Sequence, residues 1–473
     1  MRRHVLLGRF GPLDRTAIPT AADEVATDVD LVAAQRRLAH GLGQALEDLA
    51  AMGVVPTELG LDVAVLAALV HATDTRVSRE TESEDTWTRQ LRLVVPVSDP
   101  ARWSAALPLL TRMLDFLTGD RWSIGVRARP AGFAHAAQEY AQHAAQAHAQ
   151  RSAPSRAPGA SPPSPPFDGV SLFSGGADSL IGAIDLLEAG RTPLLVSHAG
   201  DGATSDAQTQ CVSALRAAYP KRAFDRLRVW MAFPDELVAG VRTEPTTRGR
   251  SFLFIALGVL AGTGLGAPFT LAVPENGFIA LNVPLDPLRL GSLSTKTTHP
   301  FYLSCWSALL ATLGIDGCVS NPYAHATKGE MMAACRNAAL ARQVLSLSLS
   351  CAAPTKGRWQ GRGIEHCGYC LPCLIRRAAI EAAWGPGADP TPYTLQDLAA
   401  RPLDTLQSEG QQVRSFQVAA ARLRARPELA KLLIHKPGPL PPDPVGWDAL
   451  AGVYARGLDE VARLVRVAQT QPG

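Results

Sequence analysis

Apolar and polar residues follow two different patterns along the chain, and the first belongs to residues 1–130. Apolar residues at helical spacing predict helices over 31–52 and 101–117. Runs rich in valine, leucine and isoleucine predict strands over 91–97 and 122–127. We therefore expect an N-terminal α+β domain. It offers no convergent set of catalytic side chains, so we expect a scaffold or a surface for a partner.

The composition changes between residues 131 and 167. An Ala/His/Gln-rich stretch leads into a segment dominated by proline and serine. So much proline and serine cannot bury a core, so the stretch is expected to be a linker or a disordered loop. His135, His143 and His148 lie within it. Nothing fixes their geometry, so we expect solvated side chains and not metal ligands.

The second pattern, over residues 168–385, alternates short apolar strands with helices. This regular alternation predicts a doubly wound parallel sheet. The expected strands are 170–173, 193–197, 227–231 and 269–273, and the expected helices are 179–188, 207–219, 250–261 and 329–345. Residues 386–473 are expected to be helical, with a proline-rich break at 436–444. The overall expectation is an α/β protein with flanking N-terminal and C-terminal regions.

Composition narrows the class of protein. The chain has 473 residues, 47% of them hydrophobic, and a formal net charge of +3. This charge is small for the length and does not indicate direct nucleic-acid binding. The longest apolar run, 252–268, is interrupted by glycines and is too short to span a membrane. We expect a cytoplasmic protein, whose eight cysteines stay reduced and favour metal binding over disulfides.

The strongest motif is the hexapeptide 174–179, Ser-Gly-Gly-Ala-Asp-Ser, between an expected strand and an expected helix. Gly175 and Gly176 let the backbone approach an anion, and the helix N-terminus offers free N–H groups. Ser174 and Ser179 add hydroxyl donors, and Asp178 can hold Mg²⁺ or cap the helix. The lysine of a Walker A loop is missing. An ordinary helix cap after a glycine turn is the competing interpretation.

This hexapeptide resembles the signature of the PP-loop ATP pyrophosphatases, whose fold is that of the adenine nucleotide α-hydrolases. The resemblance implies that ATP is attacked at its α-phosphorus and that pyrophosphate leaves as a unit. An adenylated oxygen would then react with a nitrogen or sulfur nucleophile.

Four cysteines predict a metal site. Cys367, Cys370 and Cys373 are spaced two residues apart, and Cys351 lies upstream across a loop rich in Gly, Lys and Arg. Four thiolates suit a structural, tetrahedral Zn²⁺ site. An iron–sulfur cluster is the alternative, although no fourth cysteine follows nearby. Four unrelated reduced thiols are the remaining interpretation.

The loop and the cysteines together resemble the 7-cyano-7-deazaguanine synthase (QueC) family over about residues 169–383. That family converts a 7-carboxy-7-deazaguanine to a nitrile, using ATP and ammonia. The resemblance implies that Arg250 and Lys328 contact ATP phosphates or the departing pyrophosphate. His198 follows the second expected strand and is assigned with the loop to the ATP site. Arg250 could instead be a solvated helix-start cation, and Thr327 with Glu330 could form a capping box.

Several segments depart from the biosynthetic enzymes. The stretch after the second strand differs from the usual Tyr-Gly-Gln segment, and 294–300 replaces a substrate-side segment. The arrangement resembles the QueC-like proteins of Qat-type anti-phage systems, which implies a partner protein from the same operon as amine acceptor. Glu275, Asn276 and His299 are candidate substrate-pocket residues, since polar residues at strand ends often face ligands. Ordinary turn chemistry is an equal alternative.

Three functions therefore remain open. The first is a QueC-like adenylating ligase that joins a 7-deazaguanine-type acid to a partner protein in phage defence. The second is a housekeeping nitrile synthase. The third is a non-catalytic ATP-binding scaffold. Thiolation would want an exposed reactive cysteine, which the sequence does not clearly offer.

Overall fold

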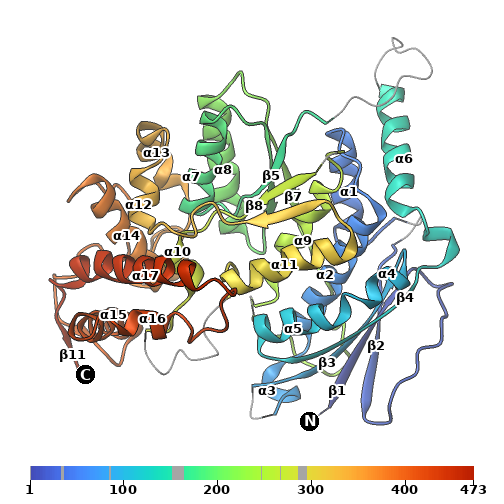
Figure 1. Ribbon diagram of the computed structural model, residues 1–473, viewed down its shortest axis with the longest axis horizontal. Coiled ribbons are helices and arrows are strands. Elements are labelled where there is room, and N and C mark those ends of the chain that lie inside the picture. The colour runs from blue at the N-terminus through green and yellow to red at the C-terminus, as the bar shows by residue number, and fades with distance from the viewer. Residues whose placement is uncertain are drawn as a thin grey trace.

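The computed structural model describes residues 2–33, 37–84, 87–151, 165–246, 248–266, 268–285 and 296–472. They form an α/β fold built on two parallel sheets, with a cluster of helices at the C-terminal side (Figure 1). The proline- and serine-rich stretch 152–164, and Ser294 in the expected substrate-side segment, lie outside the described residues.

The first sheet is N-terminal and has the strand order β2-β1-β3-β4, with every neighbouring pair parallel. Its strands are β1 (Arg3–Arg9), β2 (Glu24–Asp30), β3 (Gln90–Val97) and β4 (Arg121–Ala128). The strands expected at 91–97 and 122–127 are thus present. The helices are α1 (Leu42–Ala51), α2 (Glu58–Arg76), α3 (Arg79–Glu82), α4 (Pro100–Ser104) and α5 (Leu107–Thr118).

The helix predicted over 31–52 is wrong in its first turns. Val32 and Leu38 form an antiparallel bridge, and α1 begins only at Leu42. Gly41, at φ 97°, turns the chain into the helix with left-handed backbone geometry, which glycine adopts without strain. The helix predicted over 101–117 divides into α4 and α5. The long helix α2 had no amphipathic signal, because nearly all of its faces are buried.

The second sheet has five parallel strands in the order β7-β6-β5-β8-β9. They are β5 (Gly169–Leu172), β6 (Pro193–His198), β7 (Asp225–Val229), β8 (Phe269–Ala272) and β9 (Gly317–Ser320). The helices that connect them are α7 (Ala177–Glu188), α8 (Gly202–Ala218), α9 (Arg250–Gly262), α10 (Gly277–Leu281) and α11 (Pro300–Leu313). The strand order reverses beside β5, so the carboxyl ends of β5 and β8 form the edge where ligands bind in such sheets.

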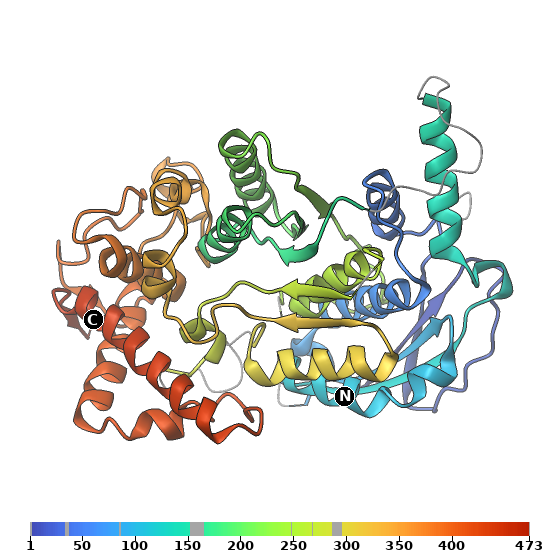
Figure 2. The same ribbon diagram turned by 45° about the horizontal axis from the view of Figure 1, so that its top comes forward.

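Helices cover both faces of this sheet (Figure 2). In β6, Leu194 and Val196 join the core that contains α9, whereas Leu195 joins the core that contains α7 and α8. Successive strand residues point to opposite faces, so this alternation is what a doubly wound sheet requires. Helix α9 is buried nearly all round, because α2 packs against it from the other side. The core of the N-terminal sheet therefore continues into the core of the second sheet.

The helix predicted over 329–345 is wrong as a single element. It consists of α12 (Lys328–Ala333) and α13 (Ala338–Val344). Between them, the Arg336 amide donates to Asp185 of α7 and the Asn337 side chain caps α13. Both interactions require the chain to leave helical geometry. Two 3₁₀ turns, η4 (Leu345–Leu347) and η5 (Lys356–Gln360), then lead to α14 (Leu371–Trp384).

Part of the predicted linker is ordered, which corrects the expectation for residues 131–151. A 3₁₀ turn, η2 (Ala131–Phe133), precedes helix α6 (Ala136–Arg151), which packs against α1 at one edge of the molecule (Figures 1 and 2). Glu58 accepts hydrogen bonds from the amides of Ala137 and Gln138 and so anchors the first turn. His143 is exposed, as expected for a solvated side chain.

The C-terminal region is helical, as expected. It contains α15 (Ser408–Ala425), α16 (Leu429–Leu433) and α17 (Pro444–Val465), with two short strands, β10 (Leu403–Asp404) and β11 (Thr470–Gln471). Helix α17 packs along α14 and α10, and one buried apolar cluster joins the three. Among the described residues, no helix has both the length and the apolar character that crossing a membrane demands.

Candidate functional site

The loop between β5 and α7 has the geometry of an anion cradle. Gly175 has φ 80°, a backbone conformation that residues with a Cβ rarely adopt. A Cβ on Gly175 would also lie 2.9 Å from Cγ of Gln208. The amides of Asp178 and Ser179 lie in the first turn of α7, where no carbonyl precedes them within the helix. The expected strand–loop–helix context of residues 174–179 is therefore present.

Four side chains meet beside this loop. Lys328 Nζ lies 3.0 Å from Asp178 Oδ1, and Asn276 Nδ2 donates to Asp178 Oδ2 at 2.8 Å. Asn276 Nδ2 also donates to Glu275 Oε1 at 3.1 Å. These residues come from α7, α12 and the end of β8, so the fold brings together four residues that the sequence assigned to different roles.

The two carboxyl groups of this cluster differ in charge. Burial alone would raise the pKa of Asp178, but the Lys328 ammonium and hydrogen bonds from Glu275 and Asn276 lower it to about 2. Burial and the neighbouring charge of Asp178 raise the pKa of Glu275 well above its ordinary value. Asp178 is therefore the carboxyl that ionises first, and Glu275 holds its proton to a higher pH than Asp178 does, as expected for two carboxyls that share a site.

Lys328 is held in place by the start of α12. Thr327 and Glu330 form the capping box that was one of the expected alternatives. In addition, the Thr327 hydroxyl donates to Glu460 of α17, and the Gly329 amide donates to the other oxygen of Glu460 at 3.3 Å. The capping box and the contact with Asp178 coexist. The C-terminal helix α17 thus helps to orient the lysine that faces the loop.

The four predicted cysteines form one cluster. The ligand atoms of Cys351, Cys367, Cys370 and Cys373 all lie within 4.8 Å of one another, so the cluster could hold a metal ion. The Sγ atoms of Cys351 and Cys370 are 3.9 Å apart, as are those of Cys367 and Cys373. With metal–sulfur bonds of about 2.3 Å, a tetrahedral site has sulfurs about 3.8 Å apart. Hydrogen bonds from the neighbouring thiols lower the pKa of Cys367.

The cysteine cluster is joined to the anion cradle by two residues that precede Cys351. The Leu349 amide donates to the Gly175 carbonyl at 2.9 Å, and the Ala177 amide donates to the Ser350 hydroxyl at 3.2 Å. The Ser350 amide donates in turn to Nε2 of His366, the residue before Cys367. Any ion that fixes the four thiols therefore also fixes the wall of the loop.

His198 and Arg250 lie on the other side of the loop, at the carboxyl end of β6. Arg250 Nη2 donates to the His198 carbonyl at 3.1 Å. Gln208 Nε2 lies 3.3 Å from both the Ser174 carbonyl and the His198 carbonyl. Gln208 thus connects this pair to the loop. Among the described contacts, Arg250 and Lys328 do not meet, and Arg250 is linked to the loop through His198 and Gln208.

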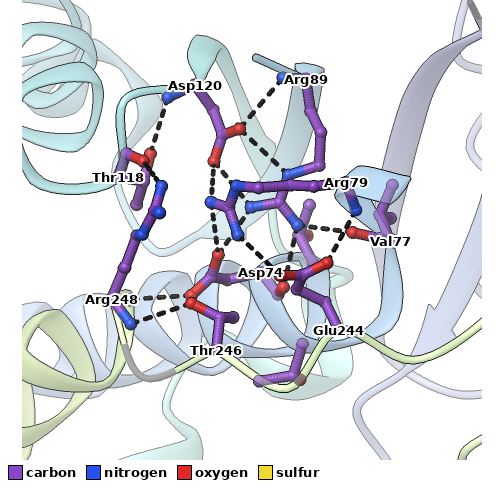
Figure 3. A network of polar contacts seen from close by, with 12 residues as sticks. Asp74, Val77, Arg79, Arg89, Thr118, Asp120, Glu244, Thr246 and Arg248 are labelled. Carbon is purple, nitrogen blue, oxygen red and sulfur yellow. Dashed lines mark hydrogen bonds and ion pairs between the residues drawn. The ribbon is translucent and has the colours of Figure 1, made fainter. Parts of the chain in front are cut away.

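The loop that carries Arg250 is fixed by a buried charge network of the N-terminal unit (Figure 3). Arg89 donates to both Asp74 and Asp120 at 2.6 Å. Asp74 Oδ2 accepts from the Gly249 amide at 2.7 Å, and a Cβ on Gly249 would lie 2.8 Å from that oxygen. Glycine at position 249 therefore has a local steric reason, because it lets the start of α9 approach Asp74.

His299 is not brought to the loop by any described contact. Its Nδ1 accepts from the Phe301 amide at the start of α11, and its ring lies 5.3 Å from that of Phe116 in α5. The residue is fully buried between the two sheets. The structure therefore groups Glu275 and Asn276 with Asp178, but places His299 in a separate environment.

Four residues near the site were missed from the sequence: His71, Gln208, Ser350 and Glu460. Only Ser350 had a usable signal, its position next to Cys351. His71 and Glu460 belong to helices of the flanking regions, and Gln208 faces the loop only because α8 packs beside α7. Their proximity depends on long-range packing.

Two comparisons with known proteins gave no match that would assign a family. No protein-family model and no curated protein sequence matches the chain.

Proposed function

We propose that the protein is an ATP-dependent adenylating ligase of the PP-loop type, with a 7-carboxy-7-deazaguanine-like acid as its substrate. The observation that carries the proposal is the glycine turn at 174–179. It lies at the carboxyl end of the central strand β5 and has an ionised Asp178 and a lysine beside it. Such a turn suits a phosphate chain, whose oxygens accept hydrogen bonds from backbone amides.

The residues around the loop have distinct roles in this proposal. The turn and the first amides of α7 bind the β- and γ-phosphates. Lys328 and Arg250 stabilise the negative charge that develops on pyrophosphate as it leaves. The acid's carboxylate attacks the α-phosphorus, and an amine then displaces AMP from the mixed anhydride.

Mg²⁺ would be held by Asp178 and Glu275. Two carboxyls on one side of the loop, one of them protonated, form an oxygen-rich site of the kind Mg²⁺ prefers. Binding of the cation would release the proton of Glu275. The metal would offset phosphate charge, while Asn276 keeps Asp178 oriented through its amide group.

Zinc is the ion we assign to the four cysteines. Sulfurs within 4.8 Å of one another surround space for a single ion and not for a multi-iron cluster. A closed shell of four thiolates is structural. Its contribution here would be to hold residues 349–351 against the loop. Reduced thiols are required for this role, which agrees with the cytoplasmic location we propose.

Pyrophosphate release tests the proposal. Full-length protein with ATP, Mg²⁺ and 7-carboxy-7-deazaguanine should release pyrophosphate, and Asp178→Asn should abolish most of it. Asp185→Asn is the matched control, because Asp185 lies on the same helix but contacts Tyr323 and Arg336. Unchanged release from the Asp178 variant, or none from the wild type, would contradict the proposal.

Mass spectrometry then identifies the amine acceptor. We propose a polypeptide from the same defence operon, because an N-terminal unit packs against the domain that contains the loop. A mass increase on a co-expressed partner supports this acceptor. Nitrile formation from ammonia by the isolated protein favours the housekeeping synthase instead, and ATP binding without pyrophosphate release favours the scaffold.

A further inference from the structure

His198, the last residue of β6, and His71 of α2 lie side by side and together have three buried ring nitrogens without a hydrogen-bond partner. Both nitrogens of His198, which is 2% exposed, and Nδ1 of His71 lack a hydrogen-bond partner. The two rings meet edge to face, with centroids 5.8 Å apart. Buried imidazole nitrogens are normally satisfied, so three unsatisfied nitrogens side by side indicate a missing ligand or water.

The nearest cation to this pair is Arg250. Its described contact is the His198 carbonyl, and among the described residues it forms no ion pair. Asp201 is the acidic residue whose charge acts on the pKa of Arg250, but its carboxylate already accepts hydrogen bonds from the amide and the hydroxyl of Thr204. Several guanidinium donors of Arg250 therefore remain for a ligand. A guanidinium with free donors prefers an anionic oxygen group.

The electrostatics of the pair fit the same ligand. Burial and the charge of Arg250 lower the pKa of His198 to about 3, and burial lowers the pKa of His71 to about 4. Both rings are therefore neutral near pH 7, and each can donate one N–H. Asp74, the acidic neighbour of His71, is already bound to Arg89 and to the Gly249 amide.

We propose that His71, His198 and Arg250 form an anion-binding subsite beside the loop 174–179, and that the N-terminal unit supplies part of it through His71. The subsite takes a carboxylate or phosphate group, which accepts from the guanidinium and from the imidazole N–H groups. Gln208 connects the subsite to the loop, since its amide donates to the carbonyls of both Ser174 and His198. The assignment of that group to a reactant rests on the proposed function.

The test measures anion binding by titration calorimetry on the full chain. The probes are inorganic pyrophosphate and 7-carboxy-7-deazaguanine, each with wild type, His71→Phe and His198→Phe. Loss of a hydrogen bond to a charged group should lower the affinity for at least one probe about tenfold or more. If the variants bind pyrophosphate more weakly, the subsite takes the phosphates of the nucleotide. If they bind 7-carboxy-7-deazaguanine more weakly, it takes the carboxylate of the substrate. Either result supports the subsite.

His40→Asn is the matched control. His40 stacks on Phe233, close to His71, but both of its ring nitrogens already bind backbone carbonyls. Asparagine also tolerates its positive φ of 57°. The control should bind both probes as the wild type does. If His198→Phe fails to fold, the partly exposed His71 carries the test, with His71→Gln as a second variant.

Unchanged affinity for both probes in the histidine variants would overturn the subsite and leave only water at these nitrogens. Binding of neither probe by the wild type would overturn it too. These outcomes differ from failure of the proposed function. A wild type that binds anions through His71 but releases no pyrophosphate would refute adenylation and keep the subsite.

Discussion

Two groups of buried polar residues, one in each half of the molecule, differ in whether their carboxylates and ring nitrogens have hydrogen-bond partners. In the N-terminal network of Asp74, Asp120, Arg79 and Arg89, every carboxylate oxygen accepts at least one hydrogen bond (Figure 3). Beside the loop 174–179, one carboxyl keeps a proton against a second, ionised one. Nearby, both nitrogens of His198 have no partner.

This difference separates a structural group from a candidate site. A network whose carboxylate oxygens all have partners without a ligand contributes to the folded state and gives a cation no free carboxylate to bind. Carboxyls that share a proton, and imidazoles without partners, are stabilised when a cation or an anion arrives. The predictions below test this distinction, beginning with the largest expected effect.

Arg89→Met should destabilise the fold most. Arg89 is fully buried, and its loss leaves the carboxylates of Asp74 and Asp120 without their main partner. Removal of one partner from a buried pair costs about 3–5 kcal/mol. Urea unfolding of the full chain measures the change. A loss under about 1 kcal/mol would mean that the network is not the structural group described here.

Removal of the metal should have the next largest effect. With metal at about 1,000 times its Kd, binding stabilises the folded state by about 4 kcal/mol. Chelation, or Cys373→Ser, should therefore lower the Tm, and should weaken ATP binding because residues 349–351 touch the loop. Cys318→Ser, which alters an exposed cysteine outside the cluster, is the control. An unchanged Tm after complete chelation would contradict a structural metal.

Asp178→Asn should act mainly on turnover. We expect pyrophosphate release to fall about 100-fold or more, which corresponds to about 3 kcal/mol of transition-state stabilisation. The loss of stability should be smaller than for Arg89→Met, because asparagine is isosteric, Asn276 can still donate to it, and Glu275 can ionise to balance the charge of Lys328. Parallel unfolding and kinetic measurements separate the two effects. A variant that unfolds as readily as Arg89→Met would remove the contrast between the two groups.

Glu275→Gln should change how stability depends on pH. The pKa of Glu275 is raised in the folded state, so wild type binds one more proton than the unfolded chain above about pH 4.5. The stabilisation that comes from this raised pKa is fully present below that pH. It is lost as the pH rises towards the pKa of the folded state, at up to about 1.4 kcal/mol of unfolding free energy per pH unit. Glutamine does not titrate, so the stability of the variant does not fall with pH in this way. Unfolding from pH 5 to 8 should show its stability rising relative to wild type, and parallel curves would refute the raised pKa.

Arg456→Ala should have the smallest effect. Arg456 and Glu330 form an ion pair at 2.6 Å, but both side chains are more than 40% exposed. Exposed pairs contribute about 0–1 kcal/mol. Thermal unfolding and pyrophosphate release should stay close to wild type. Glu460→Gln, on the same helix but bound to Thr327 and Gly329, is the informative comparison and should lower turnover more.

Sequence patterns predicted four of the five strands of the central sheet because their signals are local, and they missed β9. Strands β5, β6 and β8 are short apolar runs, each followed by glycine or polar residues, and a parallel sheet is the arrangement that such alternation permits. Helix α2 gave no usable period since it is buried on nearly all sides. The start of α6 gave no signal because its anchor, Glu58, is remote in sequence.

The sequence by itself determined the turn at 174–179 and the grouping of Cys367, Cys370 and Cys373, since short spacing fixes which atoms can converge. Cys351 is 16 residues from Cys367 and joins the cluster through the fold of the intervening loop. Only the tertiary structure decided that Lys328 and Glu275 meet Asp178, that His299 lies elsewhere, and that His71 of the N-terminal unit faces His198. The physical reason is that these residues lie on separate elements. Their distances depend on how helices pack on two sheets, which no local pattern encodes.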